Sequence, residues 1–305
     1  MHDVVTRNIT RALASMCLIA LIAACDIGSG AGQPTQAPVI TPPTQAPATA
    51  VPPTDTSAPT QIPTNQPSET APYVQCWVTT GQETVARRES SPLADEFGTA
   101  SAGDQTLALA RTNDGWLGFD PGVAQAGNEG RARLRWYQTQ GLSFTFDPVG
   151  CENSLPVVLS LQSLQNGTYL ASGLQEVTLT GGSYTDPNFN PANTGRAIFG
   201  VSMGQATAFG DLNGDGSEDA LIVLGSNTGG SGTFVEIVPV LNVDGNPQPG
   251  GSIQVGDRTP VNSLVIVDSV VTAEVLVDGP NDGFCCPSVH ETWTLTLVNG
   301  ALVKQ

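Results

Sequence analysis

Residues 210–224 read GDLNGDGSEDALIVL, and this stretch combines the two patterns that dominate the second half of the chain. A loop of glycine and short oxygen-bearing residues comes first, and the unbroken apolar run Ala220–Leu224 follows it. A short apolar run that contains β-branched residues and is bounded by turn residues predicts a buried β-strand. We therefore expect a strand over residues 220–224 and a tight turn before it.

Three further segments have the apolar or alternating character of strands: residues 234–241, 264–267 and 292–297. Asp244-Gly245 and Asn299-Gly300 mark hairpin turns, because such dipeptides favour two-residue loops between antiparallel strands. The sequence lacks long stretches of helical periodicity, and only Val157–Leu164 is expected to form a short helix. The sequence thus predicts a mainly all-β fold, with an acidic β-rich domain over residues 155–305.

The loop before the first strand spaces its oxygen atoms as calcium-binding loops do. Counting from Asp211, oxygen-bearing side chains fall at positions one, three, five and nine, and Gly216 lies at position six, where a sharp turn is needed. The candidate ligands are the side chains of Asp211, Asn213, Asp215 and Asp219 and the carbonyl of Ser217. Ca²⁺ prefers about six to eight oxygen ligands on such a wrapping loop.

An EF-hand would place a glutamate at position twelve, but that position is Ile222, inside the expected strand. The loop instead resembles the calcium loops of integrin-type (FG-GAP) β repeats, which run Asp-x-Asp/Asn-x-Asp-Gly-x-x-Asp between two strands. The resemblance implies a bound Ca²⁺ with a structural role. The chain holds one copy of the motif, which argues against a propeller of such repeats. An Asx-rich turn without metal is the alternative.

The N-terminus has the features of an export signal. Arg7 and Arg11 precede Ala12–Ala24, a mostly apolar stretch that is too short to span a bilayer as a mature helix. The run Leu21-Ile22-Ala23-Ala24-Cys25 resembles the bacterial lipobox, which implies removal of residues 1–24 and lipidation of Cys25. We expect an extracytoplasmic protein anchored by lipid to the cell membrane, at the cell surface or in the periplasm. An ordinary secretory signal is the alternative.

Residues 25–72 are rich in proline and threonine, and their apolar content is too low to offset the entropy of ordering. Such a segment is expected to be a disordered stalk that favours extended polyproline II conformations. With roughly 3.1 Å per residue, about forty residues reach on the order of 100 Å. The stalk would hold the folded part of the chain away from the membrane.

Residues 73–154 show short strands broken by glycine, proline and aspartate. The expected core residues are Val85, Leu107, Leu109, Leu117, Leu134 and Trp136. A series of motifs resembles the bacterial SH3 (SH3b) domain: Val85 with Arg87, Ser91-Pro92, Phe97-Gly98, Ala102-Gly103, Leu107–Arg111 and Asp114-Gly115-Trp116. The resemblance implies a small, partly open barrel that associates with peptidoglycan or with proteins.

Two groups of residues in this region are weak candidates for ligand binding. Trp116 and Trp136 are expected either to form an aromatic face or to lie in the core. Arg131, Arg133 and Arg135 alternate with a period of two, so that a strand would place all three on one face. That face would be either solvated or a contact for an anionic partner.

Without Cys25, an even number of cysteines remains after the signal segment, and an exported location permits disulfides. Cys76 and Cys151 lie at the two edges of the 73–154 region and are predicted to pair. Cys285 and Cys286 are adjacent, so a vicinal disulfide is expected. Reduced thiols, a soft-metal site and bonds crossed to the other pair are the alternatives.

The chain of 305 residues carries 28 acidic residues against 11 lysines and arginines, a formal net charge of −17. This balance argues against nucleic acid as a partner and favours divalent cations. His290 is the sole histidine after the signal segment, and no serine motif marks a partner for it. We therefore expect a non-enzymatic binding or scaffold protein. A wall-processing hydrolase with its active site in 155–305, and a partner or inhibitor of another exported protein, are the alternatives.

Overall fold

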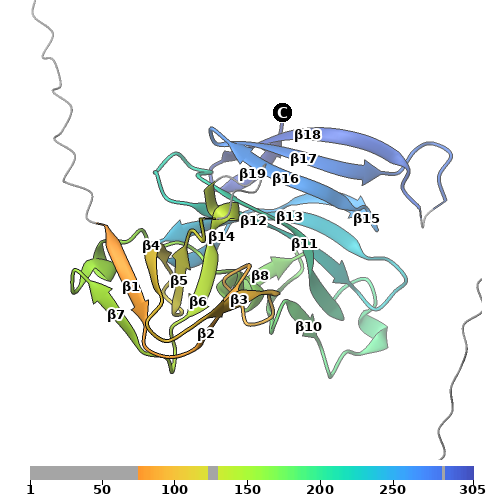
Figure 1. Ribbon diagram of the computed structural model, residues 1–305. Helices are drawn as coiled ribbons and strands as arrows, with labels where there is room; N and C mark the ends of the chain where they lie inside the picture. The colour runs from red at the N-terminus through yellow and green to blue at the C-terminus, as the bar shows by residue number, and fades with distance from the viewer. Residues whose placement is uncertain (1–74, 123–129, 284–285) are drawn as a thin grey trace, which may run out of the picture. The chain divides into compact units, whose positions relative to one another are not determined.

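The computed structural model describes residues 75–122, 130–283 and 286–305 (Figure 1). These residues belong to one compact unit and form antiparallel sheets, so the all-β prediction is confirmed. The predicted signal segment 1–24, the stalk 25–72 and Cys25 lie outside the described residues. No helix of the described part is long and apolar enough to cross a membrane.

The first seven strands form one antiparallel sheet, which we call the N-terminal sheet, in the order β3-β2-β6-β5-β4-β1-β7. Its strands are β1 (Cys76–Thr80), β2 (Thr84–Arg87), β3 (Glu96–Ala100), β4 (Gln105–Arg111), β5 (Trp116–Phe119), β6 (Arg135–Gln138) and β7 (Phe144–Asp147). Two short 3₁₀ helices accompany them, η1 (Gly130–Arg133) before β6 and η2 (Cys151–Ser154) after β7.

The core of the N-terminal sheet differs in part from the expected one: Leu117 and Trp136 are buried as predicted, while Leu107 and Leu109 are only partly buried. Val85 is exposed, while its neighbour Ala86 is buried, and on β4 the buried residues are Ala108 and Ala110. The face of these strands that carries the alanine side chains is therefore the one that points to the core. Aromatic side chains from other strands fill the space beside it, such as Phe119 and Tyr137, whose rings stack 4.3 Å apart.

The predicted pairing of Cys76 with Cys151 is confirmed. The bond joins the start of β1 to η2, with the two Cα atoms 5.3 Å apart, and closes a sequence separation of 75 residues. Both cysteines are buried and pack with Val78, Leu117 and Leu155. The disulfide therefore lies in the hydrophobic core of the N-terminal sheet.

The rest of the chain is arranged in layers around a central sheet. The central sheet consists of β10 (Ser183–Thr185), β11 (Gly200–Gly210), β12 (Asp219–Asn227), β13 (Phe234–Val243), β14 (Asn246–Pro249) and β15 (Ile253–Asp257). One face is covered by the helix α1 (Leu161–Gln165) and the hairpin of β8 (Thr168–Ala171) and β9 (Gln175–Thr178). A further 3₁₀ helix, η3 (Pro191–Asn193), precedes β11.

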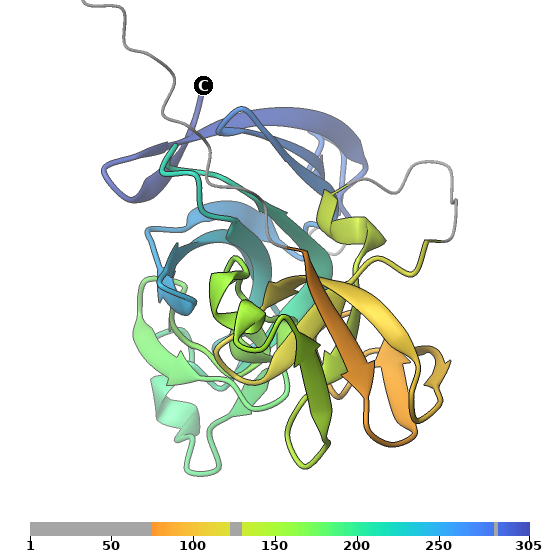
Figure 2. The ribbon, with the colours of Figure 1, turned by 60° about the vertical axis from the view of Figure 1, so that its left-hand side comes forward.

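The other face of the central sheet is covered by the outer sheet, which forms the upper layer in Figures 1 and 2. The outer sheet consists of β16 (Val261–Val267), β17 (Val270–Val277), β18 (Val289–Val298) and β19 (Ala301–Lys304). Because both faces of the central sheet are covered, β12 is buried along nearly all its length. Leu221 and Val223 contact the outer sheet, and Ile222 and Leu224 point to the opposite core.

The expected strands and turns of this region are confirmed. Residues 220–224, 234–241, 264–267 and 292–297 lie within β12, β13, β16 and β18. Asp244 and Gly245 connect β13 to β14, and both have positive φ angles, 52° and 81°. Asn299 and Gly300 connect β18 to β19 with φ angles of 50° and 79°. Two consecutive positive φ angles are the requirement of the tight hairpin turn that these dipeptides favour.

Residues 155–166 join the N-terminal sheet to the central sheet through backbone contacts. Arg111 at the end of β4 exchanges two backbone hydrogen bonds with this segment, to Pro156 at 3.0 Å and from Val158 at 2.9 Å. A helix was expected over Val157–Leu164, but α1 begins only at Leu161, since the residues before it pair with β4 and provide the N-cap. The cap is Ser160, whose Oγ accepts from the Ser163 amide at 2.7 Å. The segment is thus fixed to both sheets.

Candidate functional site

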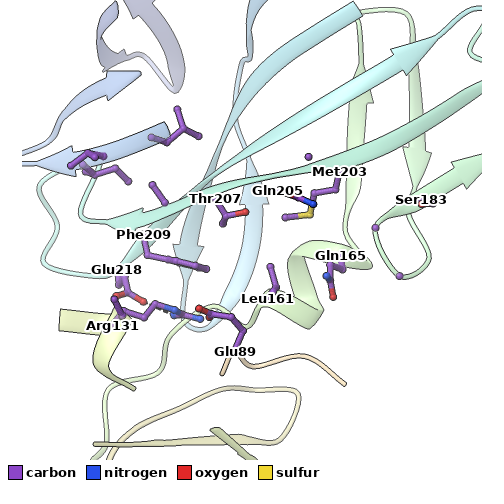
Figure 3. Close-up of a pocket in the computed structure, with 18 residues that line it drawn as sticks. Glu89, Arg131, Leu161, Gln165, Ser183, Met203, Gln205, Thr207, Phe209 and Glu218 are labelled. Carbon is purple, nitrogen blue, oxygen red and sulfur yellow. Dashed lines mark hydrogen bonds and ion pairs between the residues drawn. The ribbon is translucent and has the colours of Figure 1, made fainter. Parts of the chain in front are cut away.

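A cleft of about 870 Å³ lies where the N-terminal sheet, the central sheet and the outer sheet meet (Figure 3). Its walls come from the loop after β2, the helix η1, the helix α1 with the β9–β10 turn, β11, the loop before β12 and β16. A cleft of this volume is in the range of small-molecule and short-peptide sites. This cleft is the candidate site, and the side chains that line it set its chemistry.

Arg131 forms one end of the cleft and is itself almost fully buried, with a side-chain exposure of 7%. Its guanidinium lies between two aromatic rings, 3.7 Å from the centroid of Phe209 and 4.9 Å from that of Trp136. It donates to Glu218 at 2.5 Å, to the carbonyl of Leu159 at 2.7 Å and to Ser90 Oγ at 3.2 Å. These contacts occupy both terminal nitrogens, so Arg131 is a structural bridge between the sheets.

The expectation that Arg131, Arg133 and Arg135 share one strand face is wrong. Arg131 and Arg133 lie in the 3₁₀ helix η1, and only Arg135 lies in β6, so the period of two does not apply. Arg133 is half-exposed and pairs with Asp120 at 2.9 Å. Arg135 is buried and donates to the carbonyls of Ala132 and Leu134, which end the 3₁₀ turn. The three side chains therefore do not form a common contact surface for an anion.

Trp116 and Trp136 do not form an exposed aromatic face, because both side chains are almost completely buried. They pack with Ala110 and Val158 in a small core between the N-terminal sheet and the following segment. The indole nitrogen of Trp116 donates to the side-chain oxygen of Gln162 in α1 at 3.0 Å. Of the two alternatives for these residues, the core position is the correct one.

Glu89 is the one charged side chain of the cleft that has no partner among the described residues. It follows β2, is half-buried and makes neither a hydrogen bond nor an ion pair with a described residue. Burial raises the pKa of its carboxyl, and the negative charge of Glu218 adds to this, while the positive charges of Arg131 and Arg135 lower the pKa. The net direction is upward, as expected for a carboxylate that lacks donors.

One face of β11 supplies the floor of the cleft. Met203, Gln205, Thr207 and Phe209 alternate along the strand and line the cleft together, as Figure 3 shows. The pairing of β11 with β12 is irregular between Met203 and Thr207, which frees this stretch from the regular ladder. The floor is therefore mixed in character, with two polar side chains between two apolar ones.

Several polar groups in the cleft are free to bind. The side chains of Gln205, Thr207 and Ser183 make no hydrogen bond with a described residue. Gln165 accepts from Ser91 Oγ through its oxygen at 2.6 Å, which leaves its amide nitrogen available. The cleft thus offers one carboxylate and several amide or hydroxyl groups beside apolar walls, a composition typical of binding sites.

The acidic loop 211–219 forms a closed turn of hydrogen bonds. The carboxylate of Asp211 accepts from the amides of Gly214, Asp215 and Gly216 at 2.7 to 3.2 Å. Asp215 accepts from the Ser217 amide and from the Asn213 side chain, which lowers the pKa of Asp215. The loop therefore satisfies most of its own oxygens through the Asx-type bonds of a tight turn.

Asp219, the last predicted ligand, is completely buried at the start of β12. Its two oxygens accept from the amides of Leu212 and Asn242 at 3.0 and 2.8 Å, so it fixes the base of the loop to β13. Burial raises the pKa of Asp219, and the charges of Asp215 and Asp211 add to the effect. In the described part of the chain, no three Asp, Glu, His or Cys residues are placed together as a metal site. These hydrogen bonds hold the loop in a tight turn, and calcium binding stays a prediction.

The second cysteine pair is described only in part. Cys286 is disulfide-bonded, while Cys285 lies outside the described residues. The vicinal bond between them therefore stays a prediction. The loop around them is fixed by Asp282, whose carboxylate accepts from the amides of Gly279 and Ser288, both at 2.8 Å.

Comparisons of the chain with protein-family models, with curated proteins and with solved structures found no match. The site is therefore interpreted from its own geometry. The cleft residues Glu89, Glu218 and Gln205 were not identified from the sequence, because they are far apart in the chain. One signal in the sequence was the alternation of larger with small residues in Met203–Phe209, since a strand with polar and apolar side chains on one face is a candidate for ligand contact.

We predict that Arg131→Ala lowers the free energy of unfolding by about 3–5 kcal/mol, because it leaves Glu218 without its partner and removes the guanidinium from between two rings. Urea unfolding of the variant measures the loss. Arg133→Ala is the matched control, and it should change the stability by no more than about 0.5 kcal/mol, since its ion pair is exposed. Equal losses in the two variants would contradict the bridging role of Arg131.

Proposed function

We propose that this protein is a lipid-anchored envelope protein that binds a cell-wall component or another envelope protein, and that it is not an enzyme. The observation that carries the proposal is the cleft of about 870 Å³, with free polar groups on rigid strands. The N-terminal signal with its lipobox-like end supports the location. The resemblance of residues 73–154 to bacterial SH3 domains supports a wall or protein partner.

A specific observation keeps a hydrolase as the second candidate. Glu89 and Glu218 line the same cleft, and the pKa of Glu89 is raised by burial. Pairs of carboxylates with different environments carry out glycoside hydrolysis. Glu218, however, is engaged by Arg131 in a short ion pair, which supports a structural role for it. Binding is therefore the function that we favour.

We expect the full chain, purified in detergent, to co-sediment with isolated peptidoglycan or to retain an envelope protein from solubilised membranes. A form with Gln205→Ala and Thr207→Ala should lose most of this retention, because both side chains face the cleft and bind no described residue. A Thr294→Ala control on the exposed face of β18 should be retained as the wild type is. Release of soluble sugar from the wall, abolished in Glu89→Gln, would favour the hydrolase instead.

The anchor is tested separately from binding. In the native host, the wild-type chain should take up a labelled fatty acid and fractionate with membranes, while Cys25→Ala should take up none and appear in the soluble fraction. The reason is that two or three acyl chains give stable anchoring through their buried methylene groups, at about 0.8 kcal/mol each. Equal labelling of the two chains would refute lipidation at Cys25.

Calcium stabilisation of the 211–219 loop belongs to the same proposal. A cation would relieve the repulsion among Asp211, Asp215 and Asp219 that contributes to the raised pKa of Asp219. We expect Ca²⁺ to bind with a Kd of about 10⁻⁴–10⁻³ M and to raise the melting temperature. Both effects should be lost in Asp215→Ala and kept in the control Asp278→Ala, which lies outside the loop. An unchanged melting temperature at several millimolar Ca²⁺ would show a metal-free turn.

A further inference from the structure

The charge balance inside the cleft restricts the ligand that it can accept. Three charged side chains line it, namely Glu89, Arg131 and Glu218. Arg131 and Glu218 neutralise one another, and the second terminal nitrogen of Arg131 donates to Leu159 and Ser90. The Nε of Arg131 has no partner among the described residues, but it is buried and therefore closed to a ligand. Among the described lining residues, Glu89 is therefore the one charge without a hydrogen bond or ion pair, and an anionic ligand meets no positive group that lacks a partner.

The position of Glu89 favours a ligand that supplies N–H donors and a positive charge. A half-buried carboxylate without donors is unfavourable in the free protein, and an ammonium group placed next to it supplies the missing N–H donors and a directly paired charge. Arg131 and Arg135 act on Glu89 only through their charges, without a hydrogen bond or ion pair. The net charge of −17 for the whole chain also attracts cations over a longer range. An ammonium is better suited than a metal ion here, because the described lining residues include two carboxylates, and Glu218 is already paired with Arg131.

The walls around Glu89 indicate what carries the ammonium. Leu161, Met203, Phe209 and Ile266 provide apolar surface, which fits an alkyl chain. Gln165, Gln205 and Thr207 provide amide and hydroxyl groups, which fit the carbonyls and N–H groups of a peptide backbone. An alkyl chain that ends in an ammonium and starts from a peptide is a lysine-type side chain.

We infer that the cleft binds a short peptide through a lysine-type side chain, whose alkyl part lies along Met203 and Phe209 and whose ammonium pairs with Glu89. This inference rests on the proposed binding function and names the ligand class of the same site. Gln205 and Gln165 bind the peptide backbone. Arg131 takes no part in binding and fixes the wall of the site.

The test is calorimetric titration of the full chain in detergent with the blocked tripeptide N-acetyl-Ala-Lys-Ala-amide, whose lysine carries the only charge. The norleucine analogue, in which the ammonium is missing, is the control ligand. Wild-type protein should bind the lysine peptide at least about tenfold more tightly than the norleucine peptide, because hydrogen bonds to charged groups have about this effect.

Glu89→Gln should reduce the affinity for the lysine peptide at least about tenfold and leave the weak norleucine binding unchanged. The variant should fold, since Glu89 has no described partner to lose, and a thermal melt checks this. Glu96→Gln, an exposed glutamate on β3, is the matched control variant and should bind as the wild type does. Equal affinity of wild type and Glu89→Gln, or no binding at about 10 mM peptide, would overturn the inference.

The experiments distinguish a failure of the proposed ligand class from a failure of the proposed binding function. If peptidoglycan or an envelope protein is retained while the lysine peptide does not bind, only the ligand class is wrong. If neither the wall, nor an envelope protein, nor the peptide is bound, the binding function fails as well. Hydrolysis of the wall with unchanged peptide affinity in Glu89→Gln would overturn both in favour of the hydrolase.

Discussion

The position of the N-terminal sheet against the central sheet depends on the contacts of the Arg131 guanidinium. This group lies between Trp136 of the N-terminal sheet and Phe209 of the central sheet, and it binds Glu218 at the end of the acidic loop. Arginine suits this place because its planar group stacks on rings and still donates in several directions. A buried charge is tolerated only when it is paired, so the surrounding elements are held in one arrangement. The cleft is a consequence of that arrangement.

The strands of the central and outer sheets could be predicted because each of their sequence patterns is compatible with only one secondary structure. An apolar run such as Ala220–Leu224 is compatible with a strand that is buried on both faces, and Asp244-Gly245 fits few conformations other than a tight hairpin. The N-terminal sheet is different. In β4, leucine and alanine alternate, so both faces are apolar, and the pattern alone does not show that Ala108 rather than Leu107 faces the core.

The candidate site could not be predicted for a different reason. Glu89, Arg131, Gln205 and Glu218 come from distant parts of the chain, and only the packing of the sheets brings them to one cleft. Local patterns also misled: the alternating arginines suggested a strand, but 3₁₀ geometry at Gly130–Arg133 sends Arg131 into the interior. By contrast, the Cys76–Cys151 bond was predictable, because the parity and position of the cysteines restrict the choices.

The hydrogen-bond donors that a buried carboxylate receives distinguish the structural acids from Glu89. Asp219 is buried and receives an N–H donor on each oxygen, from Leu212 and Asn242. Glu236 is buried on β13 and accepts from the Ser172 amide at one oxygen and from the Ser252 hydroxyl at the other. Glu89 receives no donor from a described residue, although it is half-buried at the wall of a cleft. Glu152 in η2 also has one buried oxygen without a donor in the described part of the chain, but it does not line this cleft. Glu89 is the carboxylate without donors that a ligand in the cleft can reach, and this position makes it the best candidate for a recognition residue.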